Sequence, residues 1–237
     1  MKKRKALCMF AALVCFLALV AVPCHAMDSG FTLEELPEER RKNYMISLDL
    51  KPVDSPVENT GFYCFDVNEK GQYALGFQGL FIGNIVNIYD ADGTFLYGFS
   101  FDSNGSFYLE WDGDNIILYL LRDYLAYAVD PNVTCVEVAK ISDARENQEY
   151  WNGEIMSSEK EVNGVSYQAK PGLLSRHWKL VAEESDGMQT ELFNESETLV
   201  KLIALGLLNV LFSCSVVLVI VFSIRKKFKH GEISNKA

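Results

Sequence analysis

Eight short runs of aromatic and β-branched residues follow one another between residues 61 and 139, and Asp, Asn or Gly bounds each run. This pattern is typical of antiparallel strands joined by tight turns. The expected strands are 62–67, 72–77, 84–89, 94–101, 106–111, 116–121, 125–129 and 134–139. The sequence therefore predicts a mainly β domain. The turns predict positive φ at Gly71, Gly93 and Gly105, since glycine adopts this conformation without steric cost.

The strand pattern also repeats. The turn Asn68–Gly71 and its flanking strands are similar to the turn Asp102–Gly105 and its flanks, 34 residues later. We interpret this as a four-strand unit that is used twice, as in propeller blades. Further strand-like segments at 164–170, 178–183 and 188–193 allow a third unit.

These repeats resemble those of NHL-like β-propellers. The chain is more closely similar to a group of bacterial proteins that combine a signal peptide, such repeats and one membrane span. The resemblance covers about residues 60–195 and rests on the segments Phe65–Gly71, Ile88–Gly93 and Glu110–Asn115. It implies propeller-blade-like sheets and no particular activity. Because a closed propeller needs about four or more blades, two or three units imply a partial propeller with exposed sheet edges.

The N-terminus has the pattern of a secretory signal peptide. A charged start precedes an apolar run over 6–22, and the small residue Ala26 follows. Cleavage after Ala26 is expected. Two alternatives stay open, which are lipidation at Cys24 and an uncleaved anchor helix.

A second apolar segment, residues 202–224, contains 23 residues without a charge. As a helix it would be about 34 Å long, which exceeds a bilayer core of about 30 Å. A buried core helix is the alternative, but the segment is apolar on every face. We therefore expect a transmembrane helix over 199–224. The basic residues that follow it are expected to contact anionic lipid headgroups: Arg225, Lys226, Lys227 and Lys229.

Charge predicts the orientation of this helix. Residues 225–237 carry five basic side chains and one acidic side chain, whereas residues 27–198 carry 12 basic and 31 acidic ones, a net charge of −19. The positive-inside rule places the basic tail in the cytoplasm and the acidic domain outside the cell. The predicted protein is thus a single-pass protein of the cell membrane. Its acidic domain disfavours nucleic acid as a partner.

The sequence therefore divides into seven segments. They are the signal peptide 1–26, an extended lead-in 27–60, two blade-like units 61–139, a polar connector 140–163, a third β unit with the juxtamembrane segment 164–198, the transmembrane helix 199–224 and the basic cytoplasmic tail 225–237. Open sheet edges are templates for strand pairing. Either the lead-in and the connector cover them, or another chain does. We expect self-association or a protein partner at such an edge.

Two cysteines remain in the predicted exported domain, Cys64 and Cys135. They allow one disulfide across about 70 residues, or two buried free thiols. The chain contains no CxxC and no HExxH motif, so neither a cofactor nor a metal is expected. The turns Asp90–Gly93 and Asp112–Asn115 have the acidic character of calcium loops. However, Phe101 stands where an EF-hand needs Glu, and turn chemistry accounts for the carboxylates.

Aromatic residues give the best indication of function. Four of them are candidates for a surface that binds a sugar or a peptide: Tyr97, Tyr108, Trp111 and Tyr119. The alternative is that they pack the sheets. The sequence thus predicts a non-catalytic protein for binding, sensing or assembly at the cell surface, without catalytic residues. The alternative is an extracytoplasmic enzyme that acts on polysaccharide or peptide.

Overall fold

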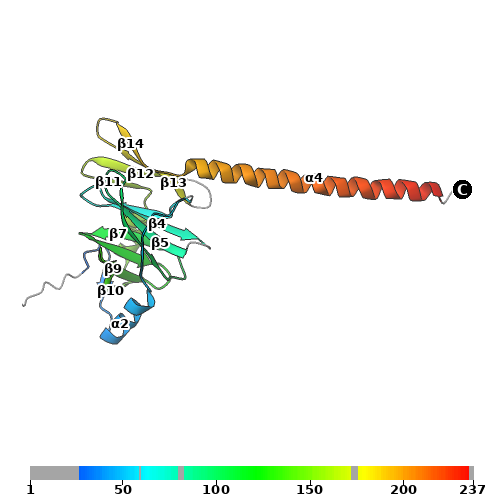
Figure 1. Ribbon diagram of the computed structural model, residues 1–237. Helices are drawn as coiled ribbons and strands as arrows, with labels where there is room; N and C mark the ends of the chain where they lie inside the picture. Colours follow the sequence, from blue (N-terminus) through cyan, green and yellow to red (C-terminus); the bar gives the residue numbers. More distant parts are fainter. Residues whose placement is uncertain (1–26, 59, 80–82, 172–175, 235–237) are drawn as a thin grey trace, which may run out of the picture.

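Three antiparallel sheets form the domain, and a long C-terminal helix projects away from them (Figure 1). The computed structural model describes residues 27–58, 60–79, 83–171 and 176–234. The signal peptide predicted for 1–26 therefore lies outside the described residues. Within these residues the prediction of a mainly β domain with one apolar C-terminal helix is confirmed.

Each sheet contains four strands that follow one another along the chain. The first sheet has the order β2-β6-β5-β4-β3, with β2 Lys51–Val53, β3 Cys64–Val67, β4 Tyr73–Gly79, β5 Gly83–Tyr89 and β6 Phe95–Phe101. The second has the order β1-β10-β9-β8-β7, with β1 Leu33–Glu34, β7 Phe107–Asp112, β8 Asn115–Leu120, β9 Leu125–Val129 and β10 Cys135–Ile141. The third runs β11-β12-β13-β14, with β11 Glu159–Val162, β12 Val165–Pro171, β13 His177–Glu183 and β14 Gln189–Asn194.

The eight expected strands are β3 to β10, and the third unit is also present. However, the predicted equivalence of two turns that lie 34 residues apart was wrong. The turn Asn68–Gly71 joins β3 to β4, whereas Asp102–Gly105 joins β6 to β7 and so leads from one sheet to the next. The place equivalent to Asn68–Gly71 in the second sheet is the turn between β7 and β8.

The first sheet lies between the other two, so both of its faces are buried. Alternate residues of a strand point to opposite faces. Ala74 of β4 belongs to a core shared with Phe107 of the second sheet, whereas Leu75 belongs to a core shared with Leu180 of the third. Burial of each large apolar side chain contributes about 1.5–3 kcal/mol. The three sheets are therefore held together face to face.

The lead-in is not simply extended. It contains strand β1 at Leu33–Glu34 and, after Pro37, helix α2 over Glu38–Ser47. Strand β1 pairs with β10, and β2 pairs with β6. Two short strands of the lead-in thus cover the outer edges of the second and first sheets.

The segment described as a polar connector contains helix α3, Arg145–Tyr150, a π-helical turn η1, Trp151–Ile155, and strand β11. Trp151 and Ile155 are buried in the core shared by the first two sheets. Asn147 is buried as well, and its side-chain oxygen accepts a hydrogen bond from the backbone of Thr32 at 2.8 Å. This segment, predicted as a polar connector, is therefore packed onto the sheets.

The hairpin turns confirm two of the three glycine predictions. Gly71 has φ +76° and Gly93 has φ +86°. Gly105 does not have positive φ. A Cβ atom there would lie 3.1 Å from the Cβ of Arg122, so close approach of the neighbouring turn explains this glycine.

Helix α4, Ser196–Ser234, is long and apolar enough over Ser196–Leu218 to cross a membrane, and the side chains described within this segment are not buried against the sheets. Asn194 precedes it and accepts a hydrogen bond from the backbone of Ser196 at 2.9 Å. The helix includes Arg225, Lys226, Lys227 and Lys229, but their side chains lie outside the described residues, so headgroup contact stays a prediction.

Candidate functional site

A pocket of about 720 Å³ lies where the three sheets meet. The first turn of each four-strand unit contributes to it: Lys70 after β3, Asp114 after β7 and Asn163 after β11. The turn after β11 lies at the pocket. From this turn, β12 runs away from the pocket, β13 returns to that end, and β14 runs away again to the start of α4. The pocket therefore opens at the end of the domain opposite to α4.

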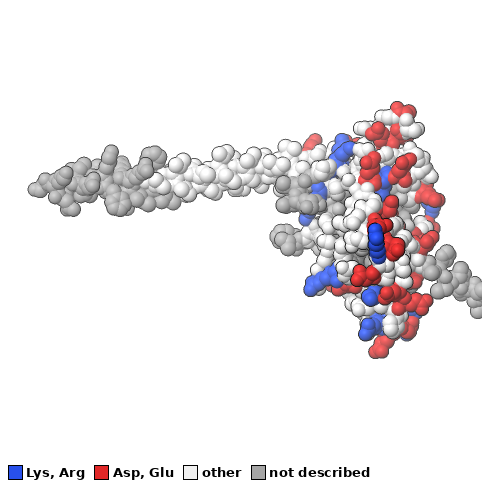
Figure 2. Space-filling model, turned by 180° about the vertical axis from the view of Figure 1, so that it is seen from behind, with Lys and Arg blue, Asp and Glu red and all other residues white. Residues whose placement is uncertain are grey.

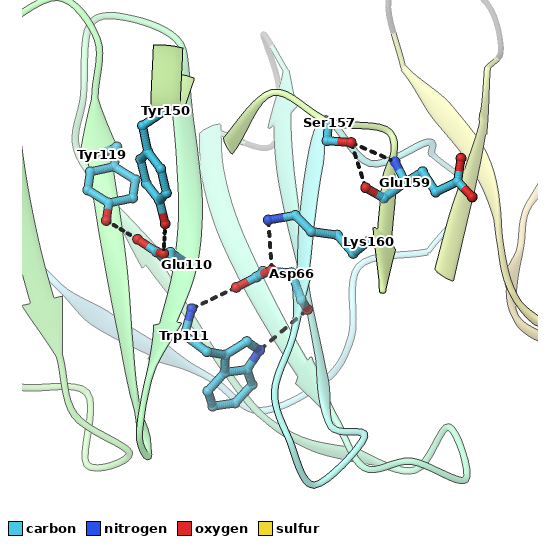
Figure 3. A network of polar contacts seen from close by, with 8 residues as sticks. All are labelled: Asp66, Glu110, Trp111, Tyr119, Tyr150, Ser157, Glu159 and Lys160. Atoms are coloured by element: carbon cyan, nitrogen blue, oxygen red, sulfur yellow. Dashed lines mark hydrogen bonds and ion pairs between the residues drawn. The ribbon is translucent and has the colours of Figure 1, made fainter. Parts of the chain in front are cut away.

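Asp66 of β3 joins the three sheets at the base of this pocket (Figure 3). Its carboxylate accepts a hydrogen bond from the Trp111 backbone N–H of β7 at 2.8 Å and lies 3.0 Å from Lys160 Nζ of β11. The side chains of Lys160 and Asp66 are only 12% and 9% exposed. Removal of one member of such a buried pair costs about 3–5 kcal/mol, because the other charge stays buried.

Glu110, one residue before Trp111, occupies the adjoining wall. Figure 3 shows that Tyr119 and Tyr150 direct their hydroxyl groups at it, and each donates to one of its two carboxylate oxygens. Burial raises the pKa of Glu110 despite these two donors. Burial is also the main reason why the pKa of Tyr119 and that of Tyr150 are raised, and the nearby Glu110 adds to it. Both tyrosines are therefore donors that stay protonated.

Ser157 lies two residues before strand β11, and its hydroxyl bonds to the backbone of Glu159, the residue that precedes Lys160. The Ser157 hydroxyl donates to the Glu159 carbonyl at 2.5 Å and accepts from the Glu159 backbone N–H at 3.1 Å (Figure 3). The π-helical turn just before it is closed by a bond from Met156 N–H to the Trp151 carbonyl at 2.9 Å. Such turns are rare and are found frequently at functional sites. This one places Glu154 on the pocket wall.

The lining of the pocket has an excess of negative charge. Six carboxylates line it against two lysines: Asp66, Glu69, Glu110, Asp114, Glu154 and Glu161 against Lys70 and Lys160. Both lysines are already paired, Lys160 with Asp66 and Lys70 with Asp114 at 2.5 Å. The side chains of Glu69, Glu154 and Glu161 form no ion pair with the described residues. The pocket is therefore acidic.

The four aromatic residues selected from the sequence do not form an exposed surface. Tyr119 is fully buried and Tyr108 is 9% exposed, and the two stand opposite each other in β7 and β8. Tyr97 is half-buried outside the pocket lining, and burial raises its pKa to about 12. Only Trp111 lines the pocket. The packing alternative therefore holds for Tyr108 and Tyr119, which face the interior because alternate strand residues do so.

Cys64 and Cys135 are free and buried, so the structure contains no disulfide between them. They belong to different sheets. Burial raises the pKa of Cys64 and raises that of Cys135 to about 12. Neither thiol is therefore ionised near neutral pH. Over the described ranges, no group of three or more His, Cys, Asp or Glu side chains has the geometry to hold a metal ion.

No protein-family model matches this chain, and no curated protein matches it either. The resemblance to NHL-like repeats therefore stays a prediction. Sequence reasoning also missed the polar residues of the pocket. Asp66 and Glu110 are single acids within the apolar runs 62–67 and 106–111, and this signal was available. Lys160 lies in a charged segment and carried no such signal.

Proposed function

We propose that this chain is a membrane-anchored, non-catalytic binding protein whose ligand site is the acidic pocket between the three sheets. The pocket is the observation that carries the proposal. Its volume lies within the usual range of about 300–1,000 Å³ for ligand sites, and polar groups from all three sheets converge on it. Its mouth is at the end of the domain remote from α4. If α4 anchors the domain in a membrane, the mouth stays accessible from solution.

The anchoring part of the proposal rests on α4 and on charge. A helix of this length and apolarity suits a bilayer core, and the basic residues that follow residue 224 favour a cytoplasmic tail. The acidic domain would then stand outside the cell, as a cleaved signal peptide requires. Three four-strand units, with β3, β7 and β11 nearest to the pocket, support a reduced propeller-type arrangement.

The alternative, an enzyme that acts on polysaccharide or peptide, has one observation in its favour. Asp66 and Glu110 line one pocket, and the pKa of Glu110 is raised by burial, as in a general acid. However, each carboxylate oxygen of Glu110 accepts a hydrogen bond from a tyrosine hydroxyl. One oxygen of Asp66 accepts a hydrogen bond from Trp111, and the other forms an ion pair with Lys160. These carboxylates already have protein partners, which favours the binding proposal.

Assembly through a sheet edge is a further part of the proposal. The edges next to β10 and β6 are covered by β1 and β2, whereas β14 pairs with β13 and with no second strand among the described residues. Its residues are mostly exposed. The edge strands β3, β7 and β11 face the shared pocket, so pairing between chains would use β14. Sedimentation of the full chain in detergent micelles checks this, since a monomer at high micromolar concentration would contradict self-association.

The binding proposal is tested on the full chain in detergent micelles. A small-molecule library is screened by thermal shift against the wild type, against Glu154→Trp, which fills the pocket, and against Glu39→Trp, which alters an exposed residue of α2. Expected hits stabilise the wild type and Glu39→Trp but not Glu154→Trp. The melting temperature without ligand shows that each variant is folded. A screen in which every hit is insensitive to the pocket variant contradicts the proposal.

A further inference from the structure

We infer that the ligand of this pocket carries an aliphatic ammonium group. The inference rests on the proposed function and specifies the chemical class that the same site takes. Both lysines of the pocket form ion pairs, and Glu110 accepts hydrogen bonds from two tyrosines. The side chains of Glu69, Glu154 and Glu161 form no ion pair or hydrogen bond with the described residues. These carboxylates would attract a cation to the pocket.

The aromatic wall is a second and independent observation. The indole N–H of Trp111 faces the Asp66 carbonyl at 3.4 Å, and its backbone N–H is held by the Asp66 carboxylate, so the ring is fixed at the pocket. Trp is the best aromatic partner for a cation, and such a contact contributes about 0.5–2 kcal/mol. Tyr150 lines the pocket as well. Aromatic and carboxylate groups together form a site for an ammonium group.

The pocket itself contains a precedent for this chemistry. Lys160 places an ammonium group 3.0 Å from Asp66, which also accepts a hydrogen bond from Trp111, and 12% of the lysine side chain is exposed. The same wall thus already accepts an alkyl-ammonium group from the protein. Glu69, Glu154 and Glu161 are carboxylates like Asp66 but have no ammonium partner. The ligand would supply the ammonium group.

The field of the whole domain acts in the same direction. Figure 2 shows that Asp and Glu side chains gather over the end of the domain away from α4. The hairpin turns at this end explain the distribution, since the turns Asp90–Gly93, Asp112–Asn115 and Glu184–Gly187 contain Asp or Glu. A surface of one sign raises the local concentration of the opposite charge and accelerates its association. An anionic ligand would be repelled.

The test uses spermidine as the probe and isothermal titration calorimetry on the full chain in detergent micelles. Saturable binding is expected, and a tenfold increase in ionic strength should weaken it, because the rim carboxylates are exposed. The double variant Glu154→Gln/Glu161→Gln should weaken binding by about tenfold. Its matched control, Glu35→Gln/Glu39→Gln, removes the same charge from exposed residues just before and within α2 and should leave the affinity unchanged. Trp111→Leu should weaken binding by about threefold.

Two comparison ligands complete the test. Octane-1,8-diol, a neutral chain of similar length, should not bind, and trilysine tests whether a peptide supplies the ammonium group instead of a free amine. Spermidine binding that is absent, or that falls equally in both double variants, overturns the inference. If pocket-dependent hits in the thermal screen are all neutral or anionic, the ammonium assignment fails but the binding proposal stands. If no pocket-dependent hit exists, both fail.

Discussion

At the scale of single residues, one acid in an apolar strand determines the chemistry of the pocket. Glu110 lies between Leu109 and Trp111, and it brings a carboxyl group into the interior, where two phenols bind it. Its burial penalises the ionised form more than the two hydrogen bonds favour it, so the pKa rises. The stability of the domain must therefore depend on the ionisation of this one residue.

Glu110→Gln tests this dependence. Because the pKa of Glu110 is higher in the folded than in the unfolded chain, the folded state binds the proton more tightly. The stability that this group contributes therefore falls as the pH rises from the unfolded pKa through the folded pKa. Melting temperatures of the wild type relative to Glu110→Gln should decrease over that range. A difference that is constant with pH would contradict the prediction.

The two buried cysteines make a second prediction at this scale. Cys64 and Cys135 are free, and burial raises the pKa of both thiols. Since the thiolate is the reactive form, iodoacetamide at pH 8 should label neither of them in the folded chain. Both should become labelled in guanidinium without a reductant, as mass spectrometry can measure. Failure to label in guanidinium would reveal a disulfide.

At the scale of elements, the strands could be predicted where side-chain pattern determines them. Strands β3 to β10 are rich in aromatic and β-branched residues, which is why the sequence located them. Strand β11 reads Glu-Lys-Glu-Val with an exposed and half-buried alternation, and its pairing with β12 comes from backbone hydrogen bonds. Strands β1 and β2, of two and three residues, are likewise defined by their partners. Such elements depend on tertiary contacts that one sequence does not reveal.

The lead-in makes a prediction of its own. Phe31, just before β1, is 5% exposed, and its ring lies 4.7 Å from Tyr119, 4.8 Å from Tyr150 and 4.7 Å from Trp151 between centroids. Phe31→Ala should destabilise the domain by about 3–5 kcal/mol. Ile46→Ala, at a residue that is 78% exposed, should change stability by less than about 0.5 kcal/mol. Chemical denaturation of the full chain measures both, and equal effects would show that the lead-in is not anchored.

At the scale of the whole molecule, the pocket could not be predicted because it is assembled from three sheets. Asp66, Glu110 and Lys160 are separated by about 40 to 50 residues in sequence, and no motif links them. The sequence pointed to aromatic residues as binding groups, yet two of the four, Tyr108 and Tyr119, face the interior. The charge difference between 27–198 and the basic tail, in contrast, does not depend on packing, and the orientation that it predicts stays a prediction.

The predicted orientation is tested on intact cells that carry an epitope on the C-terminal tail. Protease added outside should degrade residues 27–198 and leave the tail epitope protected, because the charge difference predicts a cytoplasmic tail. In permeabilised cells the epitope should also be lost. A domain that survives external protease while the tail is cleaved would reverse the topology.

The length of the strands has a consequence for what the pocket can reach. Strands β12 and β13 each contain seven residues, which corresponds to about 23 Å at about 3.3 Å per residue. With α4 in a bilayer, the mouth would stand about that far above the lipid, roughly two to three screening lengths in physiological salt. Anionic lipid would therefore neither compete for the site nor contribute to its potential. The pocket would bind ligands from the solution beyond the membrane surface. Helix α4 would fix the distance of the pocket from the lipid without contacting the ligand.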